Sequence, residues 1–381
     1  MRRLKRYICL VGLLALLAAA LTGCGFSDDS VEELFTLPRM AEEYTGLTQE
    51  LEALITQGYE YASPTGGRNI QSVQMADLDG DGQQEALAFF RMSSDEKPLK
   101  IFVFKIEGDS YARYCTIESS GTAIDSVYYQ DLNGDGRREL IVGWRISAEV
   151  QTVAVYTVAR EPVALMSSGY TRFTIQDLNG DGIPSLLVLR TDADSQPVAE
   201  FYGWQDEQMG VAYRCVLSST MASVNRGSLV SGRLDADTPA LYITGVDEQG
   251  MAATDMLVFR QDLGLVDLAL SGSSTGVSNA VFPYRQLLPQ DINGDGIIEL
   301  PSPDTSWTAE QTDGLVSWLC CNGDGQLATV AKTYHSLSCG WYFTIPESWW
   351  DWSVETATTS ISNENQFSLA INGDPVLSLY T

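Results

Sequence analysis

Histidine is almost absent from the sequence, because His335 is the only one among 381 residues. Zinc sites are commonly built from His and Cys, and general acid–base catalysis most often uses His. The sequence therefore argues against a His-rich zinc site and against catalysis by a histidine pair. No nucleophile motif lies near His335, and we predict that it is an incidental surface residue.

Basic residues are also scarce. The chain has 23 Lys and Arg against 50 Asp and Glu, which gives a formal net charge of −27. Such a surface repels phosphate backbones, so nucleic acid is excluded as a general partner. Charged residues make up 19% of the chain and hydrophobic residues 44%, a balance typical of a globular protein rather than a disordered one.

The cysteines do not form a pattern typical of disulfide-rich or redox proteins. No CxxC motif is present, and five cysteines, an odd number, follow residue 24. They cannot all pair within the chain, so we predict small buried apolar side chains rather than a disulfide scaffold. These five are Cys115, Cys215, Cys320, Cys321 and Cys339.

Long apolar runs are missing except at the start of the chain. Residues 7–21 are apolar, follow a basic segment and end in Leu21-Thr22-Gly23-Cys24. The run is shorter than the roughly 20 residues that a transmembrane helix needs. Its ending resembles the lipobox of bacterial lipoproteins, in which the Cys becomes the lipidated first residue. An ordinary signal peptide is the alternative.

This resemblance implies a lipoprotein signal peptide over residues 1–23, lipidation at Cys24 and an acidic tether over residues 24–37. Two acyl chains are enough to hold a protein on a membrane. We therefore expect the protein to be anchored to the membrane of a bacterial cell envelope, outside the cytoplasm.

One helix is predicted, over residues 38–58. Pro38 suits the first turn and Gly58 suits the end. An apolar stripe between them consists of Met40, Leu47, Leu51, Leu54 and Ile55. Short runs rich in Val, Ile, Phe and Tyr follow, as expected for strands.

An internal repeat is the most informative feature of the sequence. The segment Asp77-Leu78-Asp79-Gly80-Asp81-Gly82 returns with small changes at residues 131–136, 177–182 and 291–296, and a degenerate copy occupies residues 233–238. The spacings of 54, 46, 56 and 58 residues match one four-stranded propeller blade. We predict an all-β fold, a β-propeller of about five visible blades, or more, over residues 59–336.

We name these segments the first loop (residues 77–85), second loop (131–139), third loop (177–185), degenerate loop (233–238) and fifth loop (291–299). Together with their flanking strands they resemble the FG-GAP or VCBS repeats of integrin-α-like β-propellers, which many secreted and lipid-anchored bacterial proteins carry. The Phe-Gly and Gly-Ala-Pro signatures of that family are not obvious, and five units are visible where such propellers often have seven.

Residues 337–381 form a small β-rich C-terminal segment. A strand ends in a Pro-x-x-Trp turn at Trp349, and Asn372-Gly373 is typical of a hairpin. The segment is either a partial blade or a truncated small domain, which faintly resembles the PsbP/Mog1-like type.

The loops carry a pattern of hard oxygen ligands. Carboxylates or amides stand at positions 1, 3 and 5, a glycine at position 6 permits the turn, position 7 offers its backbone carbonyl, and Glu at position 9 closes the cage. Flexible oxygen cages suit Ca²⁺ better than Mg²⁺. We predict three to four calcium sites, strongest at the first loop; plain Asx-rich turns are the alternative.

The predicted ligands are Asp77, Asp79, Asp81, Gln83 and Glu85; Asp131, Asn133, Asp135, Arg137 and Glu139; Asp177, Asn179, Asp181 and Ile183; and Asp291, Asn293, Asp295, Ile297 and Glu299. Ser185 replaces the Glu in the third loop, and Arg233 replaces the leading Asp of the degenerate loop.

These features predict a calcium-binding module that recognises a protein or a glycan on the cell surface. The alternatives are an envelope scaffold without a dissociable ligand and a propeller enzyme, a lyase or a hydrolase. We do not expect an enzyme and nominate no catalytic residue, because the metal loops already account for the notable carboxylates.

Overall fold

The structure is a computed structural model. It describes residues 44–108, 110–248, 252–268, 287–303, 313–323, 325–336, 340–350, 354–361, 364–371 and 373–380. The predicted signal peptide, Cys24 and the acidic tether lie outside these ranges. Within the described part, no helix combines the length and the apolar character needed to cross a bilayer.

Antiparallel sheets make up most of the described chain, and they follow one another in sequence order. The first blade contains β1 (Glu60–Tyr61), β2 (Val73–Ala76), β3 (Glu85–Arg91), β4 (Leu99–Glu107) and β5 (Ser110–Ser119). The second contains β6 (Ala123–Gln130), β7 (Glu139–Arg145), β8 (Gln151–Tyr156) and β9 (Ala164–Gly169). The third contains β10 (Arg172–Gln176), β11 (Ser185–Thr191), β12 (Pro197–Gln205) and β13 (Gln208–Val216).

The fourth blade contains β14 (Ser228–Arg233), β15 (Pro239–Val246), β16 (Ala252–Arg260) and β17 (Gly264–Asp267). The fifth contains β18 (Leu300–Pro303), β19 (Asp313–Cys321), β20 (Leu327–Ser336) and β21 (Trp341–Ile345). A final sheet contains β22 (Val354–Ile361), β23 (Glu364–Ile371) and β24 (Asp374–Tyr380). Short helices α3 (Met221–Val224) and η3 (Glu347–Trp349) lie in connections. The predicted all-β fold, made of repeated four-stranded sheets, is confirmed.

The blades repeat one another in detail. In the first, second, third and fifth blades, the register shifts by one residue near Phe104, Tyr156, Tyr202 and Leu319. Such a bulge bends the strand and strengthens its twist. The shared bulge therefore recurs at the equivalent strand pair of these four blades, in step with the sequence repeat.

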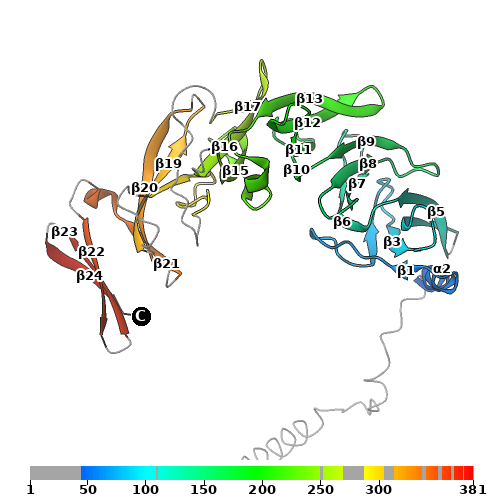
Figure 1. The fold of residues 1–381 in the computed structure, drawn as a ribbon, viewed down its shortest axis with the longest axis horizontal. Coiled ribbons are helices and arrows are strands. Elements are labelled where there is room, and N and C mark those ends of the chain that lie inside the picture. Colours follow the sequence, from blue (N-terminus) through cyan, green and yellow to red (C-terminus); the bar gives the residue numbers. More distant parts are fainter. Residues whose placement is uncertain are drawn as a thin grey trace, which may run out of the picture.

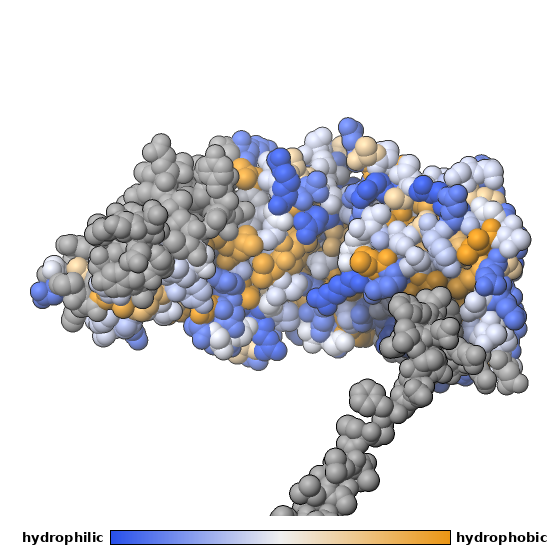
Figure 2. Space-filling view, turned by 90° about the horizontal axis from the view of Figure 1, so that it is seen from below, coloured by the Kyte–Doolittle hydropathy of each residue, from blue (hydrophilic) through white to orange (hydrophobic). Residues whose placement is uncertain are grey.

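The blades lie side by side along an arc (Figure 1). The strand pairings of the described residues do not join the first blade to the final sheet, so closure into a ring is not observed. The core lies between successive blades: Phe89 and Trp144 share the cluster of blades one and two, and Ile141 and Leu186 that of blades two and three. Along one face, apolar side chains form a band between hydrophilic margins (Figure 2).

Helix α2 (Thr45–Thr56) covers the outer face of the first blade. Leu47, Leu51 and Leu54 are buried against a cluster that includes Phe90 and Phe102, on the side opposite the second blade. Three of the predicted stripe residues are therefore buried, whereas Ile55 is exposed and Met40 lies outside the described residues. The helix thus caps the first end of the arc.

The fifth blade departs from the common plan. Its first strand is reduced to a single bridge between Gln290 and Glu299. Strand β21 pairs with β20 at the opposite edge, so the sheet still has four strands. The start of the predicted C-terminal segment therefore belongs to the fifth sheet. Further along, Trp350 and Leu377 pack with Tyr334 in one apolar cluster.

His335 is buried, so the prediction of a surface residue is wrong. Only 5% of it is exposed, its Nε2 lies 2.8 Å from Thr333 Oγ1, and its ring stacks on Tyr342. Burial lowers the pKa of His335 to about 4. The side chain is therefore a neutral part of the fifth blade, which the local sequence does not indicate.

Candidate metal centre

The first, second and third loops each connect two neighbouring, paired strands of a blade. The first loop joins β2 to β3, the second joins β6 to β7, and the third joins β10 to β11. The residue at position 2 is apolar and anchors the loop, since Leu78, Leu132 and Leu178 are all buried. The carboxylates that flank it are thereby held at the end of the sheet.

The leading Asp organises the turn through both of its oxygens. Asp77 accepts hydrogen bonds from the backbone N–H groups of Gly80 at 2.8 Å and Gly82 at 3.1 Å. Asp131, Asp177 and Asp291 accept the equivalent pair, at 2.6 to 2.9 Å. The same local geometry is therefore present in all four complete loops.

The residues at position 5 each accept one further backbone hydrogen bond. Their partners are the position-7 N–H groups of Gln83, Arg137, Ile183 and Ile297, in each case at 2.8 Å. In the third and fifth loops, the position-3 amides of Asn179 and Asn293 also donate to the position-5 carboxylate. The binding of calcium by the position-7 backbone carbonyls stays a prediction.

The Glu at position 9 is buried in each loop that has one. Glu85, Glu139 and Glu299 accept from the position-2 backbone N–H at 2.7, 2.9 and 2.9 Å, respectively. Burial raises the pKa of all three carboxyl groups. The other oxygen of Glu299, Oε1, is buried and has no hydrogen-bond partner. Such an atom is costly unless something compensates it, and a hard cation is a suitable partner.

Carboxylate oxygens come closest in the first loop. Asp77, Asp79 and Glu85 offer ligand atoms within 4.8 Å of one another, the only such group of acidic, His or Cys residues in the described part of the chain. Asp81, also predicted as a ligand, is not part of that group. The second and fifth loops carry Asn133 and Asn293 at position 3, where an amide oxygen replaces a carboxylate.

Lys105 is the residue that sequence reasoning missed. It lies on β4, and its Nζ forms ion pairs with Asp79 and, at 3.5 Å, with Glu85. The hydrogen bond from Lys105 holds the pKa of Asp79 below its ordinary value. Strand alternation in β4 could have indicated which way the side chain points, but only the pairing of β3 with β4 shows which loop it meets.

Neighbouring loops touch one another at glycines. Gly80 has φ +75°, and a Cβ added there would lie 2.5 Å from the carbonyl oxygen of Gly136 in the second loop. The backbone N–H of Arg138 donates to the carbonyl of Leu78 at 2.7 Å. The loops are thus part of the contact between blades.

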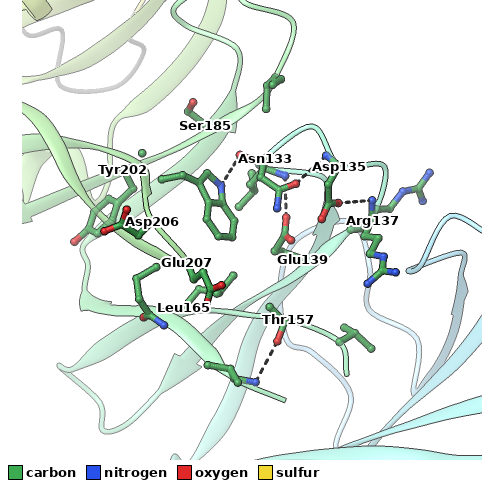
Figure 3. A pocket seen from close by; sticks show the side chains of 18 of the residues that line it. Asn133, Asp135, Arg137, Glu139, Thr157, Leu165, Ser185, Tyr202, Asp206 and Glu207 are labelled. Atoms are coloured by element: carbon green, nitrogen blue, oxygen red, sulfur yellow. Dashed lines mark hydrogen bonds between the residues drawn. The ribbon is translucent and has the colours of Figure 1, made fainter. Parts of the chain in front are cut away.

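A cleft of about 850 Å³ opens between the second and third blades (Figure 3). The second-loop residues Asn133, Asp135 and Glu139 line it, and the third blade contributes Tyr202 and the β12–β13 hairpin tip at residues 206–207. The predicted ligands of the second loop therefore line a cleft with mixed polar and apolar side chains.

The degenerate loop differs in structure as well as in sequence. Asp235 accepts from the backbone N–H groups of Asp237 at 3.1 Å and Thr238 at 2.9 Å. Arg233, which stands where the leading Asp would be, donates to the carbonyl of Ala236. The degenerate loop is therefore held by the Arg233 guanidinium and by an Asx turn at Asp235. It has no leading Asp that accepts two backbone hydrogen bonds, as the complete loops do.

No protein-family model and no curated protein matches the chain. Among solved structures, the β-propeller domain of the trilobed protease from Pyrococcus furiosus is 10% identical, over 79% of this chain and 78% of that one, with a TM-score of 0.30. The exo-β-1,3-galactanase from Phanerochaete chrysosporium is 9% identical, over 81% and 77%, with a TM-score of 0.26. Likenesses this distant carry no argument about activity, so the function has to be inferred from the loops and the cleft.

Proposed function

We propose that this protein is a calcium-binding module of propeller-type blades, held on the outside of a bacterial membrane by a lipid on Cys24. The observation that carries the calcium proposal is the buried Oε1 of Glu299, which lacks a hydrogen-bond partner in a loop rich in oxygen donors. Recurrence of the same loop geometry in four blades supports it.

The second and fifth loops suit the cation best. In the fifth, Asp291, Asn293, Asp295, Glu299 and the carbonyl of Ile297 would hold it, and the equivalent residues of the second loop would do the same. The third loop would bind more weakly, because Ser185 offers no carboxylate. Bound calcium would offset the repulsion among these carboxylates and tie the first two strands of each blade together.

Metal content of the full-length protein in detergent tests this proposal. After equilibration with calcium and removal of free ion, we expect at least two equivalents by mass spectrometry, and one fewer in Glu299→Gln. Asp235→Asn, in the degenerate loop, is the matched control and should retain the wild-type number. Fewer than two equivalents in the wild type would contradict the proposal.

The ligand of the module is proposed to be a surface protein or a glycan that enters the cleft between the second and third blades. The cleft combines carboxylates with aromatic and aliphatic side chains, a mixture that suits selective binding. A glycan array and an envelope pull-down, each with wild type and Tyr202→Ala, test this. Equal capture by both proteins would argue against the cleft, and no specific ligand in either assay would favour a scaffold.

Anchoring has its own test. Cys24→Ser should move the protein from the detergent-soluble membrane fraction to the soluble fraction. Membrane association at the wild-type level would contradict lipidation at this position.

A further inference from the structure

The residue that faces position 9 differs from blade to blade. In the first blade Phe104 pairs with Ala86, so the next residue, Lys105, stands opposite Glu85. By the same register, Thr157 stands opposite Glu139 and Gly203 opposite Ser185. Cys320 takes the equivalent place beside Glu299. Only the first of these four blades has a cation at this position.

Lys105 meets the carboxylates that calcium would need. Its ammonium contacts Asp79 and Glu85, which are two of the three acidic residues that converge within 4.8 Å. The Lys105 side chain is 21% exposed and that of Glu85 is 2% exposed, so solvent screens this contact only in part. The ammonium also lies over the ring of Tyr114, 5.2 Å from its centroid.

We propose that Lys105 is the resident cation of the first loop, so that this loop is held together without calcium. The inference rests on the proposed function of the other loops, because it divides equivalent loops into two classes. A divalent ion at the first loop would have to displace an ammonium from two carboxylates and would then repel it at close range. The loop richest in negative charge is therefore the one least in need of metal.

The second and fifth loops lack such a substitute. Thr157 is neutral, and its hydroxyl accepts a hydrogen bond from the backbone N–H of Val163 at 3.2 Å. Cys320 carries a thiol, which offers no positive charge to Glu299. Charge compensation in these two loops would have to come from a bound ion.

The experiment compares Lys105→Met with Arg160→Met in the full-length protein. Methionine retains most of the aliphatic length of lysine and removes the charge. Arg160 is the matched control, because it also lies over Tyr114, at 5.5 Å, but pairs with Glu107 rather than with a loop carboxylate. Bound calcium is counted by mass spectrometry, and the melting temperature is measured in calcium and in chelator.

We expect Lys105→Met to bind one more equivalent of calcium than the wild type, and to melt lower than the wild type in chelator, with much of the loss restored by calcium. Arg160→Met should leave both the number and the calcium dependence unchanged. If Lys105→Met does not fold in chelator, the double variant with Asp79→Asn, which removes one carboxylate, should restore folding.

Two results would overturn the inference. One is an unchanged calcium number in Lys105→Met; the other is the loss of one equivalent when Asp77→Asn is introduced into the wild type, which would show that the first loop already binds calcium. Failure of the proposed function looks different. In that case the wild type binds no calcium, whereas Lys105→Met still lowers the melting temperature in chelator if Lys105 stabilises the loop.

Discussion

The indole Nε1 of Trp204, in the third blade, donates a hydrogen bond to the backbone carbonyl oxygen of Leu132, in the second loop, at 2.7 Å. Leu132 is buried, so removal of the indole leaves its carbonyl without this donor. This hydrogen bond therefore links the third blade to the second loop, across the cleft between the second and third blades.

Trp204→Phe should lower the free energy of unfolding by about 1 to 3 kcal/mol, because it leaves a buried carbonyl without its donor. Urea denaturation followed by circular dichroism measures this. A change within about 0.5 kcal/mol, the usual range for a neutral surface substitution, would show that the bond does not contribute.

Gly80→Ala should be more destabilising than Gly82→Ala. Both glycines have positive φ, so each substitution carries a conformational cost of about 1 kcal/mol or more. Only at Gly80 would the added Cβ also meet backbone, 2.5 Å from the carbonyl oxygen of Gly136, whereas nothing lies within 4 Å at Gly82. Thermal melts of the two variants compare them directly, and equal losses would mean that the loops do not pack as described.

His335 should make the fifth blade sensitive to acid. Its pKa is lowered to about 4 from an ordinary value of 6.5, so the unfolded chain takes up a proton before the folded one does. The stabilisation is fully present above pH 6.5 and is lost as the pH falls towards 4, at about 1.4 kcal/mol per pH unit.

The comparison for His335 is with His335→Gln, which does not titrate but keeps a polar group near Thr333. Denaturant unfolding between pH 7 and pH 4.5 should show a steeper loss of stability in the wild type. Parallel curves for the two proteins would mean that folding does not lower the pKa of His335.

Leu51→Ala should cost about 2 to 5 kcal/mol of folding free energy, as is usual for removing a buried leucine side chain. The side chain of Leu51, in α2, packs on the first blade, whereas its neighbour Glu52 is exposed. Glu52→Ala is the control and should change stability by no more than about 0.5 kcal/mol. Similar values for both variants would show that α2 does not cap the blade.

Calcium should stabilise the protein in proportion to the number of filled loops. At a free concentration 100 times the dissociation constant, each independent site adds about 2.7 kcal/mol. Chelator should therefore lower the melting temperature of the wild type, and lower it less in Glu299→Gln. A melting temperature that is the same in calcium and in chelator would contradict a stabilising role.

The repeating unit and the turn geometry could be predicted from the sequence because both are local. The Asp at position 1 meets its two backbone partners within five residues, and Gly80 is needed for a positive φ. Position 2 is apolar in every loop and, as its sequence indicates, packs inward. For these reasons the loops in the structure have the boundaries that the sequence pattern indicates.

The contacts made across strands could not be predicted in the same way. Lys105 reaches Glu85 only because β3 pairs with β4 in one particular register, and His335 is buried only because β21 adds to the fifth sheet. A shift of one residue in either pairing would turn these side chains to the other face. Charge counting along the chain therefore did not include Lys105, a cation that another strand places beside the first loop.

The arc has a consequence for how the chain gains and loses structure. In the described residues, the buried clusters that join blades connect only successive ones, as in solenoid proteins. In such an array, each contact between neighbouring blades adds to the stability of the whole. Unfolding can therefore begin at one end and proceed one blade at a time.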